Sequence, residues 1–468
     1  MNDQRTLLAA LADLAGLSIF NDCGEGPLLR SFRSLVETWA ALNGDPAAGL
    51  PVSSGTSPSW EPPILNLPQR WAALMGELAL CCASRTNTRG TAAQGFFSRV
   101  RELALASDNP FTLAAEKGQE VPTFLGRLAG NDLNRLGRLA AFDIPALGFS
   151  LALYLRSHGL EDAAAGIEAE ARALWHLEGQ EQANGGLFGL EAVTAHIRRH
   201  GAGLLSHHGF FRWTPSSASP GFPASPGFPR FVLNSDPVSL ADLSGYRDQR
   251  SLVIDNTLAF LEGKAANNLL LYGDRGTGKS ATVKAVCREY LGRGLRLLEL
   301  RKEDMGELPA ILEFTASRGL RFVIFIDDLS FEGLDDSFTS LKALLEGGTE
   351  ERPANTVIYA TSNRRHLVRE HHADRPGGTG DAELRSFDTM QEQLSLSDRF
   401  GLTVFFTAPS QEEYLDIACF IAERRGLRPD TTFRDKALRW ERWFNGRSPR
   451  TASQFVAWLL GAKPFPWD

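Results

Sequence analysis

The most informative stretch of the sequence reads Gly273-Asp274-Arg275-Gly276-Thr277-Gly278-Lys279-Ser280. It matches the pattern G-x4-G-K-[ST], in which glycines let successive backbone N–H groups converge on an anion at the N-terminus of a helix. An apolar run at 268–272 precedes it, and a helical stripe of apolar residues follows it. The stretch therefore predicts a phosphate-binding loop, with Lys279 reaching the β- and γ-phosphates of a nucleotide and the Ser280 hydroxyl ligating Mg²⁺.

A second acidic motif is needed to define the class of phosphate-loop protein. The sequence supplies Phe322-Val323-Ile324-Phe325-Ile326-Asp327-Asp328, an apolar strand that ends in two carboxylates. We expect Asp327 to hold the Mg²⁺ shell and Asp328 to polarise the attacking water. The alternative is that these acids cap the helix expected to begin near Asp335.

The pattern that surrounds these motifs predicts the fold class. Short apolar runs alternate with periodic helices, which implies a parallel sheet covered on both faces. The runs lie at 268–272, 296–300, 321–326, 356–361 and 402–406. We therefore expect an α/β, doubly wound, five-stranded sheet of the P-loop NTPase kind.

The last part of the chain has no strand pattern. Ser410-Gln411-Glu412-Glu413 is a capping box that opens a helix, and Gly426 closes it. Ser448 is a plausible N-cap and Pro449 a favourable first residue for the last helix. The pattern predicts a small helical domain.

These features together resemble the AAA+ ATPases. A phosphate loop, a strand ending in two acids, a polar residue ending the next strand, an arginine before the fifth strand and a helical lid form that family's pattern. The runs Asn-Asn-Leu-Leu-Leu-Tyr-Gly-Asp-Arg-Gly-Thr-Gly-Lys-Ser and Ser-Leu-Ser-Asp-Arg-Phe-Gly-Leu look most like a group of bacterial AAA+-type ATP-binding proteins classed as a domain of unknown function. The resemblance covers residues 236–468 and implies ATP and Mg²⁺ as cofactors.

The resemblance also implies roles for single residues. Asn363 looks like the sensor-1 residue that orients the attacking water, and Arg450 resembles the sensor-2 arginine, which the lid would bring to the γ-phosphate. Arg399 resembles an arginine finger, although Arg364 and Arg365 lie near the same expected surface. A finger reaches into a neighbour's site, so the resemblance implies a homo-oligomer. Tyr246 resembles a residue that lines the adenine pocket of that family.

Two departures from the AAA+ pattern bear on activity. The second acid is Asp328 where most members have the longer Glu, which favours slow hydrolysis, although replication-initiator ATPases share the Asp-Asp form. The segment 301–308 lacks the aromatic-apolar-Gly loop with which substrate-threading rings grip polypeptide.

The remaining half of the chain shows helices and no catalytic constellation. We expect a mainly helical N-terminal domain at 1–212 with a loop at 44–63, then a Pro/Ser/Gly-rich linker at 213–235. The ATPase core would occupy 236–408 and the lid 409–468. The apolar segment 145–155 predicts a central buried helix. His196 and His200 have a spacing that zinc can use, but no third ligand is evident and a structural role is favoured.

Composition restricts the function further. The chain has 49 basic and 56 acidic side chains, a net charge of -7, which argues against strong non-specific nucleic-acid binding. Five scattered cysteines and no long apolar run favour a soluble, cytoplasmic protein without a membrane span. We expect an ATPase that remodels or loads a protein partner, recruited by the N-terminal helices. A slow nucleotide-dependent switch or scaffold and a DNA-loading factor are the alternatives.

Overall fold

The computed structural model describes residues 4–42, 63–83, 92–177, 188–215, 227–232, 238–329, 352–363, 399–444, 446–461 and 465. The chain divides into two compact units, Met1–His207 and His208–Asp468. Each unit has its own hydrophobic core and is treated separately below.

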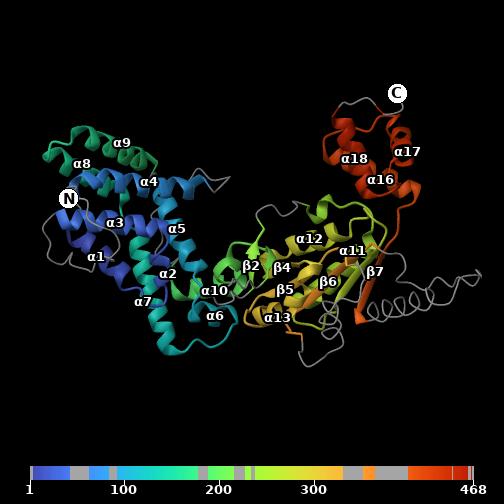
Figure 1. The fold of residues 1–468 in the computed structure, drawn as a ribbon, viewed down its shortest axis with the longest axis horizontal. Helices are drawn as coiled ribbons and strands as arrows, with labels where there is room; N and C mark the ends of the chain where they lie inside the picture. The colour runs from blue at the N-terminus through green and yellow to red at the C-terminus, as the bar shows by residue number, and fades with distance from the viewer. Residues whose placement is uncertain are drawn as a thin grey trace, which may run out of the picture. The chain divides into compact units, whose positions relative to one another are not determined.

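The first unit is helical in its described residues (Figure 1). Large apolar side chains such as Phe32, Trp71 and Phe96 are almost fully buried and form one core. Asp132 stabilises the turn at Ser18 and Ile19, because its buried carboxylate accepts the backbone N–H groups of these two residues at 2.8 and 2.7 Å. The helices are α1 (Gln4–Ala15), α2 (Asn21–Gly24), α3 (Pro27–Leu42), η2 (Pro63–Asn66), α4 (Leu67–Ala83), α5 (Ala92–Ala106), α6 (Pro110–Glu116), α7 (Thr123–Ala140), α8 (Ile144–Ser157), α9 (Glu161–Leu177), α10 (Leu190–His200) and η4 (Gly203–Ser206).

Helix α8 differs from the central buried helix that its composition predicts. Leu147, Leu151 and Leu155 are fully buried, but Leu153 is 66% exposed. The buried side packs closely, because a Cβ added at Gly148 would lie 2.7 Å from the Ala171 Cβ of α9. The helix is therefore apolar all round while only part of its surface enters the core.

Among the described helices, no single one is long and apolar enough to cross a bilayer. Helices α7 and α8 meet this requirement of length and composition only as a pair, with a bend of 56° between them. Both of these helices bury apolar residues in the core of the first unit.

The second unit is built on a parallel sheet that contains all five predicted strands. Their spatial order is β4-β5-β6-β3-β7, and neighbours in this series are parallel. The strands are β3 (Leu269–Gly273), β4 (Leu295–Leu300), β5 (Arg321–Ile326), β6 (Thr356–Ser362) and β7 (Leu402–Phe406).

Helices cover both faces of this sheet, as the doubly wound prediction requires (Figure 1). Val323 and Phe325 of β5 share one core with apolar residues of α11 (Arg247–Leu261) and α12 (Lys279–Glu289). Phe322 points to the opposite face because side chains alternate along a strand, and it contacts Phe314 of α13 (Leu308–Ala316). Short 3-10 turns complete the described core, namely η5 (Leu240–Asp242), η6 (Leu291–Arg293) and η7 (Lys302–Glu307).

The sheet has seven described strands, so the prediction of five is too small. Strand β1 (Phe210–Thr214) is parallel to β4, and β2 (Phe228–Phe231) pairs antiparallel with β1 at the edge. The predicted linker at 213–235 is therefore wrong where these strands lie; residues 216–226 and 233–237 are outside the described part. Trp213 of β1 is buried and donates its indole N–H to the Glu307 carboxylate at 3.2 Å, which fixes the added strand against the core.

Three helices form the described lid, and the N-caps of α16 and α18 are those that the sequence predicts. Helix α16 (Gln411–Arg424) begins with a capping box in which Ser410 and Glu413 bond each other's backbone N–H groups. Helix α18 (Pro449–Leu460) begins at Ser448, whose side chain accepts the Thr451 N–H at 3.1 Å. The lid's core joins these helices to α17 (Phe433–Trp443).

Candidate nucleotide-binding site

The glycine-rich loop connects β3 to α12 and has the backbone that its sequence predicts. Gly273, Gly276 and Gly278 have φ angles of 127°, 77° and 93°, which only glycine adopts readily. A Cβ at Gly273 would also lie 2.1 Å from the Phe406 carbonyl oxygen of the neighbouring strand. The loop therefore presents the N-terminus of α12 to the cavity beside it.

Lys279 is the first residue of α12 and is 5% exposed. Its ammonium donates to the carbonyl oxygens of Gly273 and Asp274 at 3.0 and 2.7 Å. Burial lowers the pKa of Lys279 to about 8, although the nearby carboxylates of Asp274, Asp328 and Asp327 act in the opposite direction. Phosphate oxygens would favour the charged form of this side chain.

Asp327 follows β5 and lies between two hydroxyl groups. Ser280 and Thr361 both donate to its Oδ1, each at 2.6 Å. A hydroxyl and a carboxylate from different elements thus meet at one point, and these are the oxygen ligands that Mg²⁺ accepts while it keeps several waters. The donor set of Ser280 and Asp327 fits this ion, as their positions in the sequence predict.

Asp328 has a left-handed backbone, with φ at 54°. Its N–H donates to the Thr361 hydroxyl at 3.0 Å, and its carboxylate accepts from the Asn363 amide at 2.5 Å. Residues that follow β5 and β6 are brought together in this way, because neighbouring parallel strands end at the same edge. Sequence reasoning identified Asp328 and Asn363 but gave Thr361 no role of its own.

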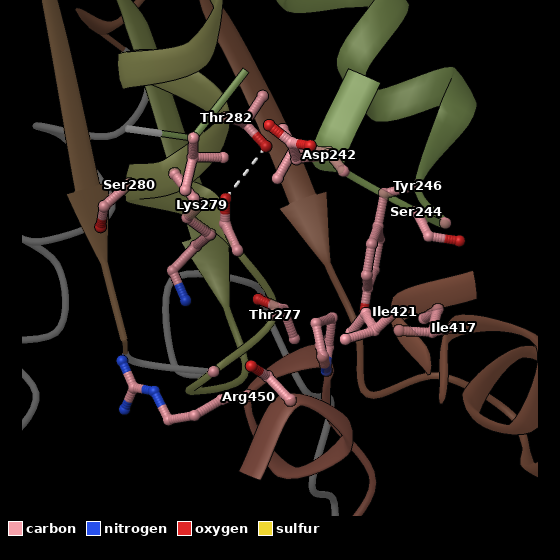
Figure 2. A pocket seen from close by; sticks show the side chains of 18 of the residues that line it. Asp242, Ser244, Tyr246, Thr277, Lys279, Ser280, Thr282, Ile417, Ile421 and Arg450 are labelled. Atoms are coloured by element: carbon pink, nitrogen blue, oxygen red, sulfur yellow. Dashed lines mark hydrogen bonds between the residues drawn. The ribbon is translucent and has the colours of Figure 1, made fainter. Parts of the chain in front are cut away.

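The lid meets the loop at the start of α18. The Arg450 N–H donates to the Gly276 carbonyl at 3.2 Å, and a Cβ added at Gly276 would lie 2.9 Å from the Ser448 hydroxyl. Figure 2 shows the basic ends of Lys279 and Arg450 pointing into the same space. The two cations that the sequence places far apart therefore belong to one site.

An apolar recess lies at the other end of the cavity, which has a volume of about 1140 Å³. Tyr246, Ile417 and Ile421 gather there (Figure 2), and Tyr246 donates its hydroxyl to the Thr407 carbonyl at 2.7 Å. Burial, with smaller effects of nearby acids, raises the pKa of the Tyr246 phenol. An aromatic ring and aliphatic side chains suit the flat face of a nucleobase. Arg275 and Thr277 line the cavity at the loop between the two ends.

The loop is also attached to the connection between core and lid. Asp274 accepts the Ala408 N–H at 2.7 Å and donates its own N–H to the Phe406 carbonyl at 2.9 Å. The side chain of a loop residue thereby fixes the chain where β7 passes toward α16. No local pattern in the sequence indicates this contact.

Arg399 has a different position from the other predicted site residues. It is half-buried beside the buried Phe400, just before β7, and it is not among the described residues that line the cavity. The competing candidates Arg364 and Arg365 lie outside the described residues, as does the helix expected near Asp335. A finger role for Arg399 thus requires the cavity of another subunit.

The described residues contain no cluster of three or more metal-ligating side chains. His196 and His200 lie side by side with ring centroids 4.6 Å apart. Burial, together with His200 and other nearby cations, lowers the pKa of His196 to about 4. His196 is therefore neutral at physiological pH.

A P-loop on a parallel sheet of this strand order, two acids at the end of β5 and a helical lid define the AAA+ ATPase class. The chain belongs to the family described as "Protein of unknown function (DUF815)", whose match spans residues 213–463.

Two further similarities involve named proteins. Replication factor C subunit 3 of Oryza sativa subsp. japonica is 32% identical over 170 residues, a match that covers 32% of this chain and 45% of that protein. The Holliday junction branch migration motor RuvB of Thermotoga maritima matches with 18% identity and a TM-score of 0.33, covering 48% of this chain and 65% of RuvB. The chain spans less than two thirds of either protein, and the fold assignment rests on its own strand order and loop geometry.

Proposed function

We propose that this protein binds ATP with Mg²⁺ and hydrolyses its γ-phosphate. The observation that carries the proposal is the docking of the lid on the phosphate loop, with the Arg450 N–H on the Gly276 carbonyl beside the buried Lys279. This arrangement gathers two cations where the phosphates of a nucleotide would lie. The recess at Tyr246 and Ile417 would take the base.

Each polar residue at the strand ends then has a chemical task. Asp328 accepts a proton from the attacking water, and Asn363 positions both the water and the acid. Asp327 and Ser280 hold Mg²⁺, which neutralises charge on the β- and γ-phosphates when bound. Lys279 and Arg450 stabilise the negative charge that spreads over the transferred phosphoryl group.

Replacing Lys279 tests the proposal most directly. Lys279→Ala should weaken ATP binding by roughly tenfold or more and remove turnover, because charge-assisted hydrogen bonds to the phosphates are lost. Binding of a fluorescent ATP analogue and phosphate release measure the two effects. Lys264→Ala is the matched control, since Lys264 is exposed and pairs with Glu262 away from the cavity. A Lys279→Ala protein with normal binding and turnover would refute the site.

We further propose that hydrolysis drives remodelling or loading of a protein partner, recruited by the helical first unit of an oligomer. Reduced, scattered cysteines favour action in the cytoplasm, and the described Cys23, Cys287 and Cys419 are free thiols. The partner would bind the helical unit, so removing residues 1–207 should leave basal turnover in place and abolish stimulation by the partner.

A slow nucleotide-dependent switch is the second candidate. It is favoured by the short Asp328 side chain and by the 2.5 Å bond that draws its carboxylate toward Asn363. Single-turnover kinetics separate the two functions. A switch hydrolyses bound ATP much more slowly than it exchanges ADP, whereas a motor hydrolyses ATP faster than a switch does.

A DNA-loading role is the third candidate, suggested by the Asp327-Asp328 pair, a form that replication-initiator ATPases share. It predicts that DNA stimulates turnover, and the charge of -7 opposes it.

A further inference from the structure

An ion pair crosses from core to lid at the lining of the cavity. Asp242, at the end of η5, pairs with Arg424, the last residue of α16. Both side chains line the cavity beyond the apolar recess. Neither has a task in the phosphate chemistry described above.

The core segment that ends in Tyr246 contacts the lid at successive points. Tyr246 bonds the Thr407 carbonyl, where the chain leaves β7 for the lid. Gly245 packs against Ile417 in the middle of α16, where an added Cβ would lie 3.1 Å from Ile417 Cδ1. Asp242 then meets Arg424 at the far end of the same helix. Of these three contacts, the ion pair lies farthest along α16 from the connection at Thr407.

This distance makes the pair sensitive to the angle of the lid. Helix α16 has 14 residues, and at 1.5 Å per residue it extends about 20 Å. A rotation of the lid by about 10° about the connection would move Arg424 by roughly 3.5 Å on this lever while Thr407 barely moves. Such a displacement is enough to separate an ion pair and to open the base end of the cavity.

Hydrogen bonds within the core fix the position of the Asp242 side chain for this contact. Its carboxylate accepts the Ser239 N–H at 3.0 Å and the Ser239 hydroxyl, which form a capping box around η5. Leu243 is fixed in turn, because its carbonyl accepts from the Arg250 guanidinium at 2.6 Å. Arg424 lies in the last turn of α16, where the helix dipole favours a cation. Asp242 is thus anchored to the core, and Arg424 moves with the lid.

We propose that the Asp242–Arg424 ion pair is a latch that holds the lid over the nucleobase and sets the rate at which nucleotide leaves. The inference rests on the proposed nucleotide site. The two side chains are 40% and 52% exposed, so the attraction is modest and is screened by salt.

The release of mant-ADP, followed by stopped-flow fluorescence in the full chain, tests the latch. Arg424→Gln should accelerate release by about two- to fivefold, the range expected of an exposed ion pair. Arg424→Lys should keep the charge and a rate within about twofold of wild type. Raising salt from about 0.05 to 0.5 M should accelerate release from the wild type by a larger factor than release from Arg424→Gln, because salt screens the phosphate contacts of Lys279 and Arg450 in both proteins but the ion pair only in the wild type.

Arg434→Gln is the matched control. Arg434 is also an exposed lid arginine, but it pairs with Asp416 inside the lid at 3.7 Å, so its loss should leave release unchanged. Asp242→Asn completes a double-mutant cycle, in which the double variant should release mant-ADP no faster than the quicker single variant.

The outcomes separate the latch from the site itself. A wild-type chain that does not bind mant-ADP would refute the proposed function and the latch with it. Normal binding, combined with wild-type release by Arg424→Gln, equal acceleration by Arg434→Gln or additive effects in the cycle, would refute the latch alone.

Discussion

Asp328 combines an uncommon backbone with a position at the proposed reaction centre. A φ of 54° is costly for most side chains, and Asp and Asn are among those that tolerate it best. The Asn363 amide and the Thr361 hydroxyl fix this conformation from the adjacent strand. Strain held in place by neighbours is a feature of functional sites.

Asp328→Asn should keep the fold and nucleotide binding but lower the rate of hydrolysis by about 10²-fold or more, because an amide cannot accept the proton of the attacking water. Phosphate release and mant-ADP affinity, measured in parallel, check the two parts. Asp255→Asn, on the exposed surface of α11, should change neither. Hydrolysis at the wild-type rate in Asp328→Asn would remove Asp328 from the mechanism.

Single residues also show how far the site could be predicted. The loop, both acids, Asn363 and Arg450 were found because each belongs to a local motif. The roles of Thr361 and Asp274 were not, because their partners lie on other elements and become neighbours only when the sheet forms. The bond from Asp274 to Ala408 joins residues separated by 134 positions.

The secondary-structure elements also divide into those that the local sequence predicts and those that it does not. The five predicted apolar strands and the capped lid helices carry strong local signals, and the structure contains all of them. Strand β1 runs into the Pro/Ser/Gly-rich stretch, and β2 includes Pro229, which is disfavoured inside a strand. Strand β1 depends on pairing with the distant β4, and β2 depends on pairing with β1, so their composition alone indicates a linker.

Close packing of α8 against its neighbours gives a prediction at this level. Gly148→Ala should destabilise the first unit by about 1–3 kcal/mol, because the added methyl would clash with Trp71 and Ala171. Gly166→Ala in α9 is the control; it meets no atom within 4 Å and should stabilise the helix by about 0.5–1 kcal/mol. Chemical denaturation measures both. Equal effects of the two substitutions would show that α8 has room at Gly148.

At the scale of the whole molecule, the proposed role of Arg399 depends on whether subunits assemble into an oligomer. If Arg399 completes a neighbour's site, turnover per subunit should rise with protein concentration, and Arg399→Ala should lower the maximal rate by about a thousandfold. ATPase assays across a dilution series check this, with Arg434→Gln as a control for loss of surface charge. Turnover that is independent of concentration and unaffected by Arg399→Ala would indicate that each subunit works alone.

The hairpin of β1 and β2 also has a mechanical consequence. The chain enters the second unit at His208 and is hydrogen-bonded to β4 from Phe210 onward. Tension on the preceding segment would therefore load the β1–β4 ladder in shear, in which several hydrogen bonds resist together. Strand β4 adjoins β5, which ends at Asp327 and Asp328. A load carried by the helical unit would be transmitted into the sheet one strand away from the acids to which we assign hydrolysis.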